Sequence, residues 1–300
     1  MASTIVVSDL HKAYGETRAV DGVSFAVEPG EFFGILGPNG AGKTTTLEII
    51  EGLRQPDRGT VTVLGESPWP RNPRLAPRIG VQMQATAFFE RLTAREQIRA
   101  FAELYQVPVK KADEMLETVG ISGKDKTRTD KLSGGQKQRL SIACALVHDP
   151  ELVFLDEPSA ALDPQGRRNL WDLLRGLNAQ GRTVVLTTHY LDEAEMLCER
   201  VAIMDGGQIL EMGPPATLVR GLDAPTRISV ETGVLSTDEA ERLFPDATVE
   251  DDTVSLTIAT RDPATVLSAL AERRALKGLA VRSATLEDVF LQITGREYRA

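Results

Sequence analysis

Three short stretches of the sequence carry side chains that could bind a nucleotide and cleave its phosphate. Residues 37–44 fit the glycine-rich pattern G-x-x-x-x-G-K-S/T of a phosphate-binding loop. Residues 132–136 read Leu-Ser-Gly-Gly-Gln, and residues 152–155 form an apolar run that ends in the carboxylates of Asp156 and Glu157. The glycine-rich stretch alone predicts only that a nucleotide phosphate binds. The two acids add groups that could hold a metal ion and activate water.

The glycine-rich stretch follows a predicted strand and precedes a predicted helix, which favours a phosphate-binding loop. Its glycines let the backbone approach the phosphates, and successive N–H groups and the helix N-terminus then face the anion. Lys43 would neutralise the β- and γ-phosphates, the Thr44 hydroxyl suits a Mg²⁺ ligand, and Thr45 can reach the α-phosphate. The residues expected to hold ATP here are Gly37, Pro38, Asn39, Gly40, Ala41, Gly42, Lys43, Thr44 and Thr45.

The adjacent acids are predicted to serve different chemical roles. Mg²⁺ prefers carboxylates, hydroxyls and water, so Asp156 is a candidate ligand that acts through a water molecule. Glu157 is then placed to polarise the attacking water as a general base. A solvated turn often carries such a pair, but this pair ends an apolar run and is followed by Pro158, which favours a functional site.

The strands and helices that must position these residues follow from the hydrophobic pattern. Residues 31–36 form an apolar run that leads into the glycine-rich loop, and residues 43–51 should form the helix after it. Residues 152–155 and 183–187 are continuous apolar runs, as expected of parallel strands that are covered on both faces. Strands that alternate with helices predict a doubly wound α/β core.

Composition limits the classes of function. The net charge of −9 does not supply the basic surface that binding to a nucleic-acid backbone needs, so no nucleic acid is expected as a partner. We find no apolar run long enough to span a bilayer. The N-terminus has no basic segment followed by an apolar one, so we do not expect secretion by a signal peptide. Cys144 and Cys198 are the only cysteines and read as buried free thiols, so we expect a cytoplasmic protein.

The loop, the Leu-Ser-Gly-Gly-Gln tract and the acidic strand end, in this order, resemble the ATP-binding cassette (ABC) ATPases over about residues 1–220. This resemblance implies a P-loop NTPase cassette with a RecA-like parallel sheet, an antiparallel β subdomain and a helical signature subdomain at about residues 85–131. Residues 221–300 read as a small α+β domain, with the order β-α-β-β-α-β and a final helix. We expect this domain to regulate the cassette or to stabilise a dimer.

The resemblance also assigns single residues outside the three motifs. Tyr14 matches the aromatic residue that stacks on adenine, and His189 matches the switch histidine that contacts the γ-phosphate. Gln84 matches the glutamine that senses Mg²⁺ and water and links to the membrane partner, although Gln82 is a competing candidate. Asp163 matches the loop that crosses to the other subunit.

The Leu-Ser-Gly-Gly-Gln tract implies that one chain does not complete a site. It opens a predicted helix and so forms a second anion-binding nest. In the family, this nest faces the γ-phosphate held by the opposite subunit, so two ATP sites require a head-to-tail pair of cassettes, and a homodimer would suffice. The residues expected to contact the partner's nucleotide are Ser133, Gly134, Gly135 and Gln136.

The C-terminal stretch 284–296 is similar to the tail of the daunorubicin/doxorubicin-resistance type of export ATPase. Proteins of that type serve permeases that export drugs, antibiotics, lipids or polysaccharides. An ordinary amphipathic helix would have the same pattern, and both interpretations can hold together. Phe88 and Phe89 could line the groove that receives a helix of the permease, or they could simply pack in the core.

The favoured hypothesis is an ATPase subunit of an exporter, peripheral on the inner face of the cell membrane and bound to an integral membrane permease. The alternative is a soluble cassette ATPase that acts on ribosomes or DNA, but such proteins typically carry two cassettes or long coiled-coil insertions. A regulatory module that binds ATP without hydrolysing it is a third possibility, which Glu157 and His189 argue against. An importer ATPase would more often end in a small β-barrel.

Overall fold

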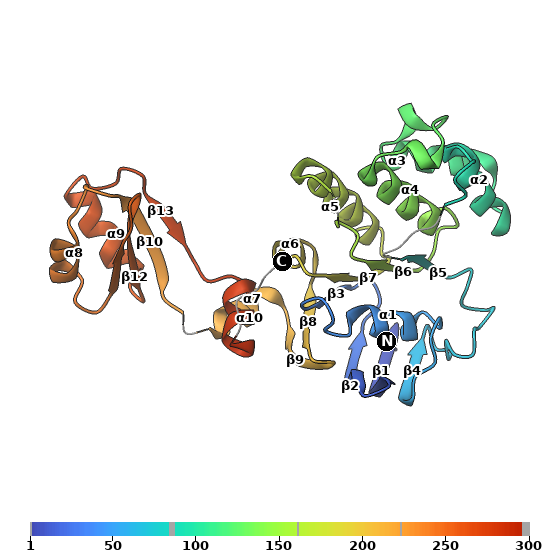
Figure 1. Ribbon diagram of the computed structural model, residues 1–300, viewed down its shortest axis with the longest axis horizontal. Coiled ribbons are helices and arrows are strands. Elements are labelled where there is room, and N and C mark those ends of the chain that lie inside the picture. Colours follow the sequence, from blue (N-terminus) through green and yellow to red (C-terminus); the bar gives the residue numbers. More distant parts are fainter. Residues whose placement is uncertain (1, 84–87, 161, 223, 296–300) are drawn as a thin grey trace. The chain divides into compact units, whose positions relative to one another are not determined.

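The computed structural model of the chain describes residues 2–83, 88–160, 162–222 and 224–295 (Figure 1). The chain divides into two compact units, and the division falls between Pro215 and Ala216. The first unit contains all three motifs. None of the described helices is both long and apolar enough to cross a bilayer.

A six-stranded sheet forms the centre of the first unit. Its first five strands in spatial order run parallel, and the last is antiparallel. Three of these strands, β3, β6 and β7, are buried along their whole length, which explains their continuous apolar sequences. The spatial order is β5 (Ile79–Gln82), β6 (Leu152–Asp156), β7 (Thr183–Thr188), β3 (Phe32–Leu36), β8 (Arg200–Asp205) and β9 (Gln208–Gly213).

A three-stranded antiparallel sheet supplies the second layer, with β1 (Ile5–Tyr14) between β2 (Thr17–Val27) and β4 (Arg58–Val63). Helix α1 (Lys43–Ile50) contributes side chains to the core that joins the two sheets. Fully buried side chains of that core include Ile5 of β1, Phe33 of β3, Ile50 of α1, and Phe154 of β6. Helix α1, which follows the phosphate-binding loop, therefore lies between the two sheets.

Helices α2 (Ala94–Leu104), α3 (Val109–Thr118) and α4 (Gly134–Leu146) share a separate apolar core. Helix α2 begins in a capping box, because Thr93 Oγ1 accepts from the N–H of Glu96 and the Glu96 carboxylate accepts from the N–H of Thr93. The fully buried Ile98, Leu116 and Leu140 pack in this core. Helix α4 thus anchors the Leu-Ser-Gly-Gly-Gln tract at its N-terminus (the signature tract) in the helical part of the cassette.

Two short 3₁₀ turns and three further helices complete the connections. The turns η1 (Ser122–Lys124) and η2 (Thr129–Lys131) lead from α3 to α4. Helices α5 (Pro164–Asn178) and α6 (Leu191–Leu197) flank β7 in sequence and contact each other, and α7 (Pro215–Gly221) follows β9.

The second unit is an antiparallel sheet with helices, in the chain order that the sequence predicts. Strand order in the sheet is β11-β12-β10-β13. Ile228, Leu256 and Leu270 are fully buried in its own apolar core. Its elements are β10 (Thr226–Glu231), α8 (Thr237–Leu243), β11 (Thr248–Asp251), β12 (Ser255–Thr260), α9 (Pro263–Glu272), β13 (Ala280–Arg282) and α10 (Leu286–Thr294).

The buried position of Phe154 gives a test of the central sheet. We expect Phe154→Ala to lower the free energy of unfolding by about 3–5 kcal/mol, because it leaves a cavity under a fully buried strand. Both tryptophans, Trp69 and Trp171, lie in the first unit, so denaturant unfolding followed by tryptophan fluorescence reports on that unit. The control is Leu104→Ala, whose side chain is 77% exposed and should change stability by about 0.5 kcal/mol or less. Equal losses would contradict the assignment of the core.

Candidate nucleotide site

The carboxyl ends of three neighbouring parallel strands bring the predicted site residues together. In the sheet register Leu36 of β3 lies opposite Thr188 of β7, and Asp156 of β6 lies opposite Thr187. The glycine-rich loop follows β3, the acidic pair ends β6, and His189 follows β7. Segments that are more than a hundred residues apart in the sequence therefore meet at one edge of the sheet, where ligands bind in open α/β folds.

The glycine-rich loop is tightly held by the surrounding backbone. Gly42 has φ 100°, and a Cβ placed there would lie 2.1 Å from the carbonyl oxygen of Ala19. Lys43 Nζ donates hydrogen bonds to the carbonyls of Gly37 at 2.8 Å and Pro38 at 3.1 Å, so it folds back over the loop. Burial lowers the pKa of Lys43, and the neighbouring carboxylate of Glu157 partly offsets this. The loop thus surrounds a buried cation, as phosphate binding requires.

Glu157 joins the loop to the histidine after β7. Its Oε1 lies 3.4 Å from Lys43 Nζ, and its Oε2 lies 3.1 Å from His189 Nδ1. Its backbone has φ 48°, and its N–H donates to the carbonyl of Thr187 at 3.1 Å. Three residues predicted from separate motifs are therefore in direct contact. A phosphate bound at this loop would compete with the Glu157 carboxylate for the ammonium group of Lys43.

Asp156 and Thr44 form an oxygen-lined position beside this cluster. Thr44 Oγ1 donates to Asp156 Oδ1 at 3.2 Å, and the hydroxyl of Thr187 donates to the same oxygen. Burial raises the pKa of Asp156, against the effect of these hydroxyl donors. A carboxylate and a hydroxyl in contact fit Mg²⁺, which takes one or two protein oxygens and keeps several waters. Thr187 was not predicted as a site residue. The sequence feature that could have indicated it is a hydroxyl residue near the end of an apolar strand.

The signature tract forms the N-terminus of α4. Ser133 is the N-cap: its Oγ accepts from the N–H of Gln136 at 3.3 Å, and Gln136 Oε1 accepts from the N–H of Ser133 at 3.0 Å. Gly134 and Gly135 form the first turn, and a Cβ on Gly135 would lie 3.0 Å from the side chain of Leu162. Asp163 lines the same open hollow as this tract. The Gln136 side chain therefore caps the helix on which the tract lies.

The remaining predicted residues lie around these groups. Tyr14 is 44% exposed at the end of β1, and the guanidinium carbon of Arg54 lies 5.3 Å from the centre of its ring. Asp163 caps α5 by accepting from the N–H of Gly166 at 2.7 Å. Gln84 lies outside the described residues. Its competitor Gln82 is buried, and its Nε2 donates to the carbonyl of Met83 at 2.7 Å.

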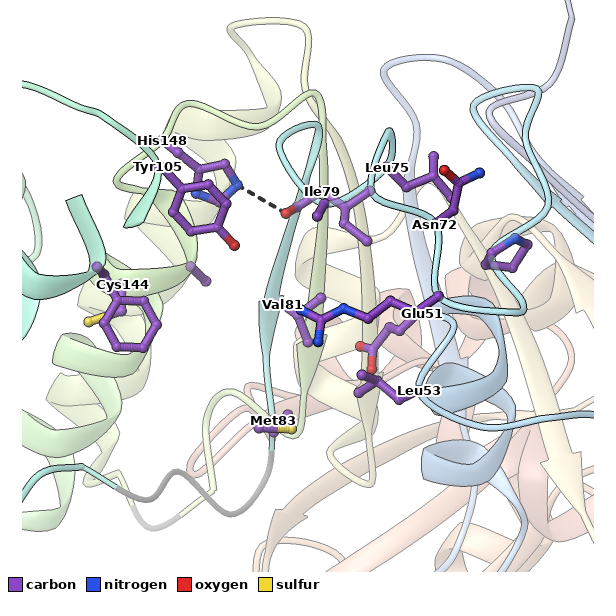
Figure 2. A pocket seen from close by; sticks show the side chains of 15 residues that line it. Glu51, Leu53, Asn72, Leu75, Ile79, Val81, Met83, Tyr105, Cys144 and His148 are labelled. Carbon is purple, nitrogen blue, oxygen red and sulfur yellow. Dashed lines mark hydrogen bonds between the residues drawn. The ribbon is translucent and has the colours of Figure 1, made fainter. Parts of the chain in front are cut away.

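A separate cavity of about 200 Å³ opens between the C-terminal end of α1 and the helical part of the cassette (Figure 2). Tyr105 and His148 stack on one side of it with ring centres 3.9 Å apart, and His148 Nε2 lies 3.0 Å from the carbonyl of Ile79. On the opposite side, Glu51 is 9% exposed, and burial raises its pKa well above 4.5. Cys144 also lines the cavity, and burial raises its pKa to about 12.

The close contact at Gly42 gives a direct test of the loop. We expect Gly42→Ala to weaken binding of Mg²⁺-ATP by about tenfold or more, because the new methyl group must displace the loop from the carbonyl of Ala19. Isothermal titration calorimetry would measure the affinity. Gly181→Ala is the control, since Gly181 also has a positive φ of 88°, but a methyl group added there would meet no other atom within 4 Å. Equal affinities for the two variants would contradict this account of the loop.

Comparison with known proteins identifies the family of the chain. Residues 20–160 match the family model described as ABC transporter. Nod factor export ATP-binding protein I of Paraburkholderia xenovorans (strain LB400) is 40% identical over 303 aligned positions, which cover 98% of both chains. The protein of the same name from Rhizobium etli (strain ATCC 51251 / DSM 11541 / JCM 21823 / NBRC 15573 / CFN 42) is 39% identical over 98% of this chain and 94% of its own.

Solved structures agree with the first unit. The dimeric structure of a bacterial ABC transporter cassette superposes with a TM-score of 0.66 at 29% identity, and covers 70% of this chain and 98% of the other. A post-hydrolysis state of that cassette, bound to ADP and Pi, gives a TM-score of 0.65. The fold is therefore the P-loop cassette that the motifs predict, and the chain belongs to the ATP-binding proteins of ABC transporters.

Proposed function

We propose that this chain is the ATP-hydrolysing subunit of an ABC exporter and powers a separate transmembrane permease. The observation that carries the proposal is the contact of Glu157 with both Lys43 and His189 at the mouth of the phosphate loop. A carboxylate in that position lies beside the place where a γ-phosphate binds to the lysine. Such a carboxylate can accept the proton of a water that attacks the phosphorus.

Each residue of the cluster has a defined role in this proposal. Lys43 and His189 neutralise and orient the γ-phosphate, while Glu157 holds and deprotonates the attacking water. Asp156 and Thr44 would hold Mg²⁺, which supplies charge neutralisation to the phosphate oxygens. Tyr14 is proposed to stack on adenine with its exposed ring, and Gln84 is proposed to sense the metal and water.

We propose that two copies of the chain pair head to tail. Ser133 and the two glycines after it begin α4 with backbone N–H groups that could face a phosphate on a second cassette. Asp163 lies beside this tract and is proposed to cross the same interface. Support comes from the relative whose solved structure is described as a dimeric cassette. Residues 221–300 are proposed to regulate or stabilise that dimer.

Export is supported by the names of the relatives, which are described as Nod factor export proteins. We propose that the substrate of this exporter falls among drugs, antibiotics, lipids or polysaccharides, as for the daunorubicin/doxorubicin-resistance type. The protein would then lie on the inner face of the cell membrane, held there by its permease. The alternative, action on ribosomes or DNA, lacks a supporting observation and conflicts with the net charge of −9.

The cavity beside Glu51 is the proposed docking position for the permease. Leu53 and Met83 line it and are 49% and 52% exposed, so apolar side chains stand at its rim. Phe88 packs against the core of the helical part, whereas Phe89 is 67% exposed and can take part in docking. A helix of the permease could cover this apolar rim.

The role of Glu157 can be tested by a substitution that preserves its shape. We expect Glu157→Gln to bind Mg²⁺-ATP with an affinity close to that of the parent chain and to lower kcat by about 100-fold or more, since the amide cannot accept the proton. Phosphate release and calorimetry would measure the two quantities. Glu151→Gln is the matched control. Glu151 lies just before the first residue of β6, at the end of the strand away from Glu157, and it is paired with Arg78. Parental turnover in Glu157→Gln would exclude Glu157 as the base.

The same variant tests the transporter assignment. With ATP and Mg²⁺ the arrested Glu157→Gln chain should remain with its partner through gentle solubilisation of membranes from the native host. We expect an integral membrane protein to copurify with it. Recovery only from the soluble fraction, with ribosomes or nucleic acid attached, would overturn the exporter assignment while leaving the ATPase site intact.

The raised pKa of Glu51 predicts a pH-dependent stability. Between 4.5 and the raised pKa the folded chain holds a proton that the unfolded chain has lost, so stability falls as the pH rises through this window. Glu51→Gln keeps the side chain neutral and should raise Tm at pH 8 by about 2–4 °C, the shift that about 1 kcal/mol makes in a domain of this size. At pH 4.5 the gain should be smaller.

The control for this pH dependence is Glu48→Gln in the same helix. Glu48 accepts from Arg54 at 2.6 Å, so neutralising it removes an attraction and should give no gain in Tm at pH 8. Thermal unfolding of the three proteins at pH 4.5 and pH 8 provides the measurement. A gain for Glu51→Gln that is the same at both pH values would show that its ionisation does not limit stability.

A further inference from the structure

The cavity at the end of α1 has a carboxyl group on its wall that no donor satisfies. Glu51 directly follows the last residue of α1 and is 9% exposed. Its backbone N–H donates to the carbonyl of Leu47 at 2.9 Å, but its carboxyl group makes no hydrogen bond or ion pair with any residue that the structure describes. A buried carboxyl group without a donor is unusual, and it requires a structural or functional reason.

The surroundings of this carboxyl group oppose a negative charge. Burial raises the pKa of Glu51, and the charges of Asp156 and Glu48 add to the effect. The carbonyl groups at the C-terminus of α1 act in the same direction. Among the described residues, no cation is paired with Glu51: Arg54 pairs with Glu48 at 2.6 Å, and Arg71 lines the cavity with an exposed side chain. The site therefore lacks a positive charge that would let Glu51 ionise.

The histidine and the cysteine on the cavity wall do not supply that charge. Burial lowers the pKa of His148 below 6.5, so its ring is neutral at pH 7, and it stacks on the ring of Tyr105. Its Nε2 lies 3.0 Å from the carbonyl of Ile79, and a carbonyl can only accept, so this nitrogen carries the proton. Cys144 stays a thiol, because burial raises its pKa to about 12.

The space in front of the carboxyl group suits a long side chain with an apolar stem. The cavity measures about 200 Å³, more than ten times the roughly 10–15 Å³ that one water molecule needs. Leu53 and Met83 are half exposed at its rim, and Leu75 and Val81 line its wall (Figure 2). An aliphatic stem would pack on these side chains while a charged end reaches Glu51.

We propose that Glu51 binds the cationic side chain, lysine or arginine, of a permease helix that docks at this cavity. The cation would pair with the ionised carboxylate, and the proton that Glu51 holds in the free chain would pass to solvent. This pairing adds a specific charge contact to a docking position that is otherwise apolar. The inference rests on the proposed function, in which the cavity receives the permease.

The chemistry of the site is tested with propylguanidinium, which reproduces an arginine side chain, and with its neutral isostere propylurea. Ligand-observed NMR titration of the full chain at pH 8 should give a millimolar Kd for propylguanidinium and binding about tenfold weaker or less for propylurea. Glu51→Gln should remove this preference. Glu48→Gln is the matched control and should keep it, because Glu48 lies on the same helix, does not line the cavity and is paired with Arg54. Equal affinities for the two probes in the parent chain would overturn the proposal.

The affinity for propylguanidinium should also depend on pH. The guanidinium keeps its charge throughout, so the affinity of the parent chain should rise between pH 4.5 and pH 8 as Glu51 ionises. Protonation of His148 at the lower pH would also repel the probe, and Glu51→Gln measures that contribution alone. The same rise in the parent and in Glu51→Gln would contradict a role of Glu51.

The permease as the source of the cation is tested in the arrested Glu157→Gln chain. Adding Glu51→Gln should lower the amount of integral membrane protein that copurifies by about tenfold, whereas adding Glu48→Gln should not change it. If propylguanidinium binds at Glu51 but the copurified amount is unchanged, the site takes a free cation and the proposal is wrong. If the Glu157→Gln chain retains no membrane protein at all, the proposed function fails, and so does the permease as the occupant of this cavity.

Discussion

The parallel pairing of β3, β7 and β6 is the constraint on which the nucleotide site depends. Because the three strands run in one direction and are buried along their length, their carboxyl ends lie at one edge in a fixed register. Lys43, Asp156 and His189 are brought together only through that register. A change of pairing by one residue would turn each of the strand-end side chains toward the opposite face.

The same burial makes the charges of the site dependent on one another. Lys43, Asp156 and Glu157 are each less than 10% exposed, so each would be costly to ionise alone. Glu157 balances the lysine, while hydroxyls of Thr44 and Thr187 donate to Asp156. A triphosphate that binds with a metal ion would bring both signs of charge into this environment and could compete for these contacts.

Local sequence patterns and the family resemblance predicted the fold, and they placed the candidate site residues in segments that meet at one edge of the sheet. The phosphate loop and the acidic strand end lie in single continuous stretches, where each residue type follows from the chemistry of its neighbours. The order of elements in the second unit was also predicted, because capping residues and alternating patterns are local. Thr187 could not be found in this way, since its partner Asp156 comes from a segment separated in the sequence. Gln84 is predicted by resemblance and lies outside the described residues.

Helix α1 connects the phosphate loop to the cavity beside Glu51. It begins at Lys43 in the phosphate loop, and Glu51 caps its other end beside the cavity, about 12 Å away at the rise of an α-helix. A carboxylate at a helix C-terminus is opposed by the helix dipole, and here burial opposes its charge as well. A partner that fills the cavity and supplies a donor or a cation would stabilise that charge. Because a short helix behaves as a rigid body, a change at Glu51 would reach the phosphate loop directly, which makes α1 the simplest physical link between the proposed docking cavity and the phosphate loop.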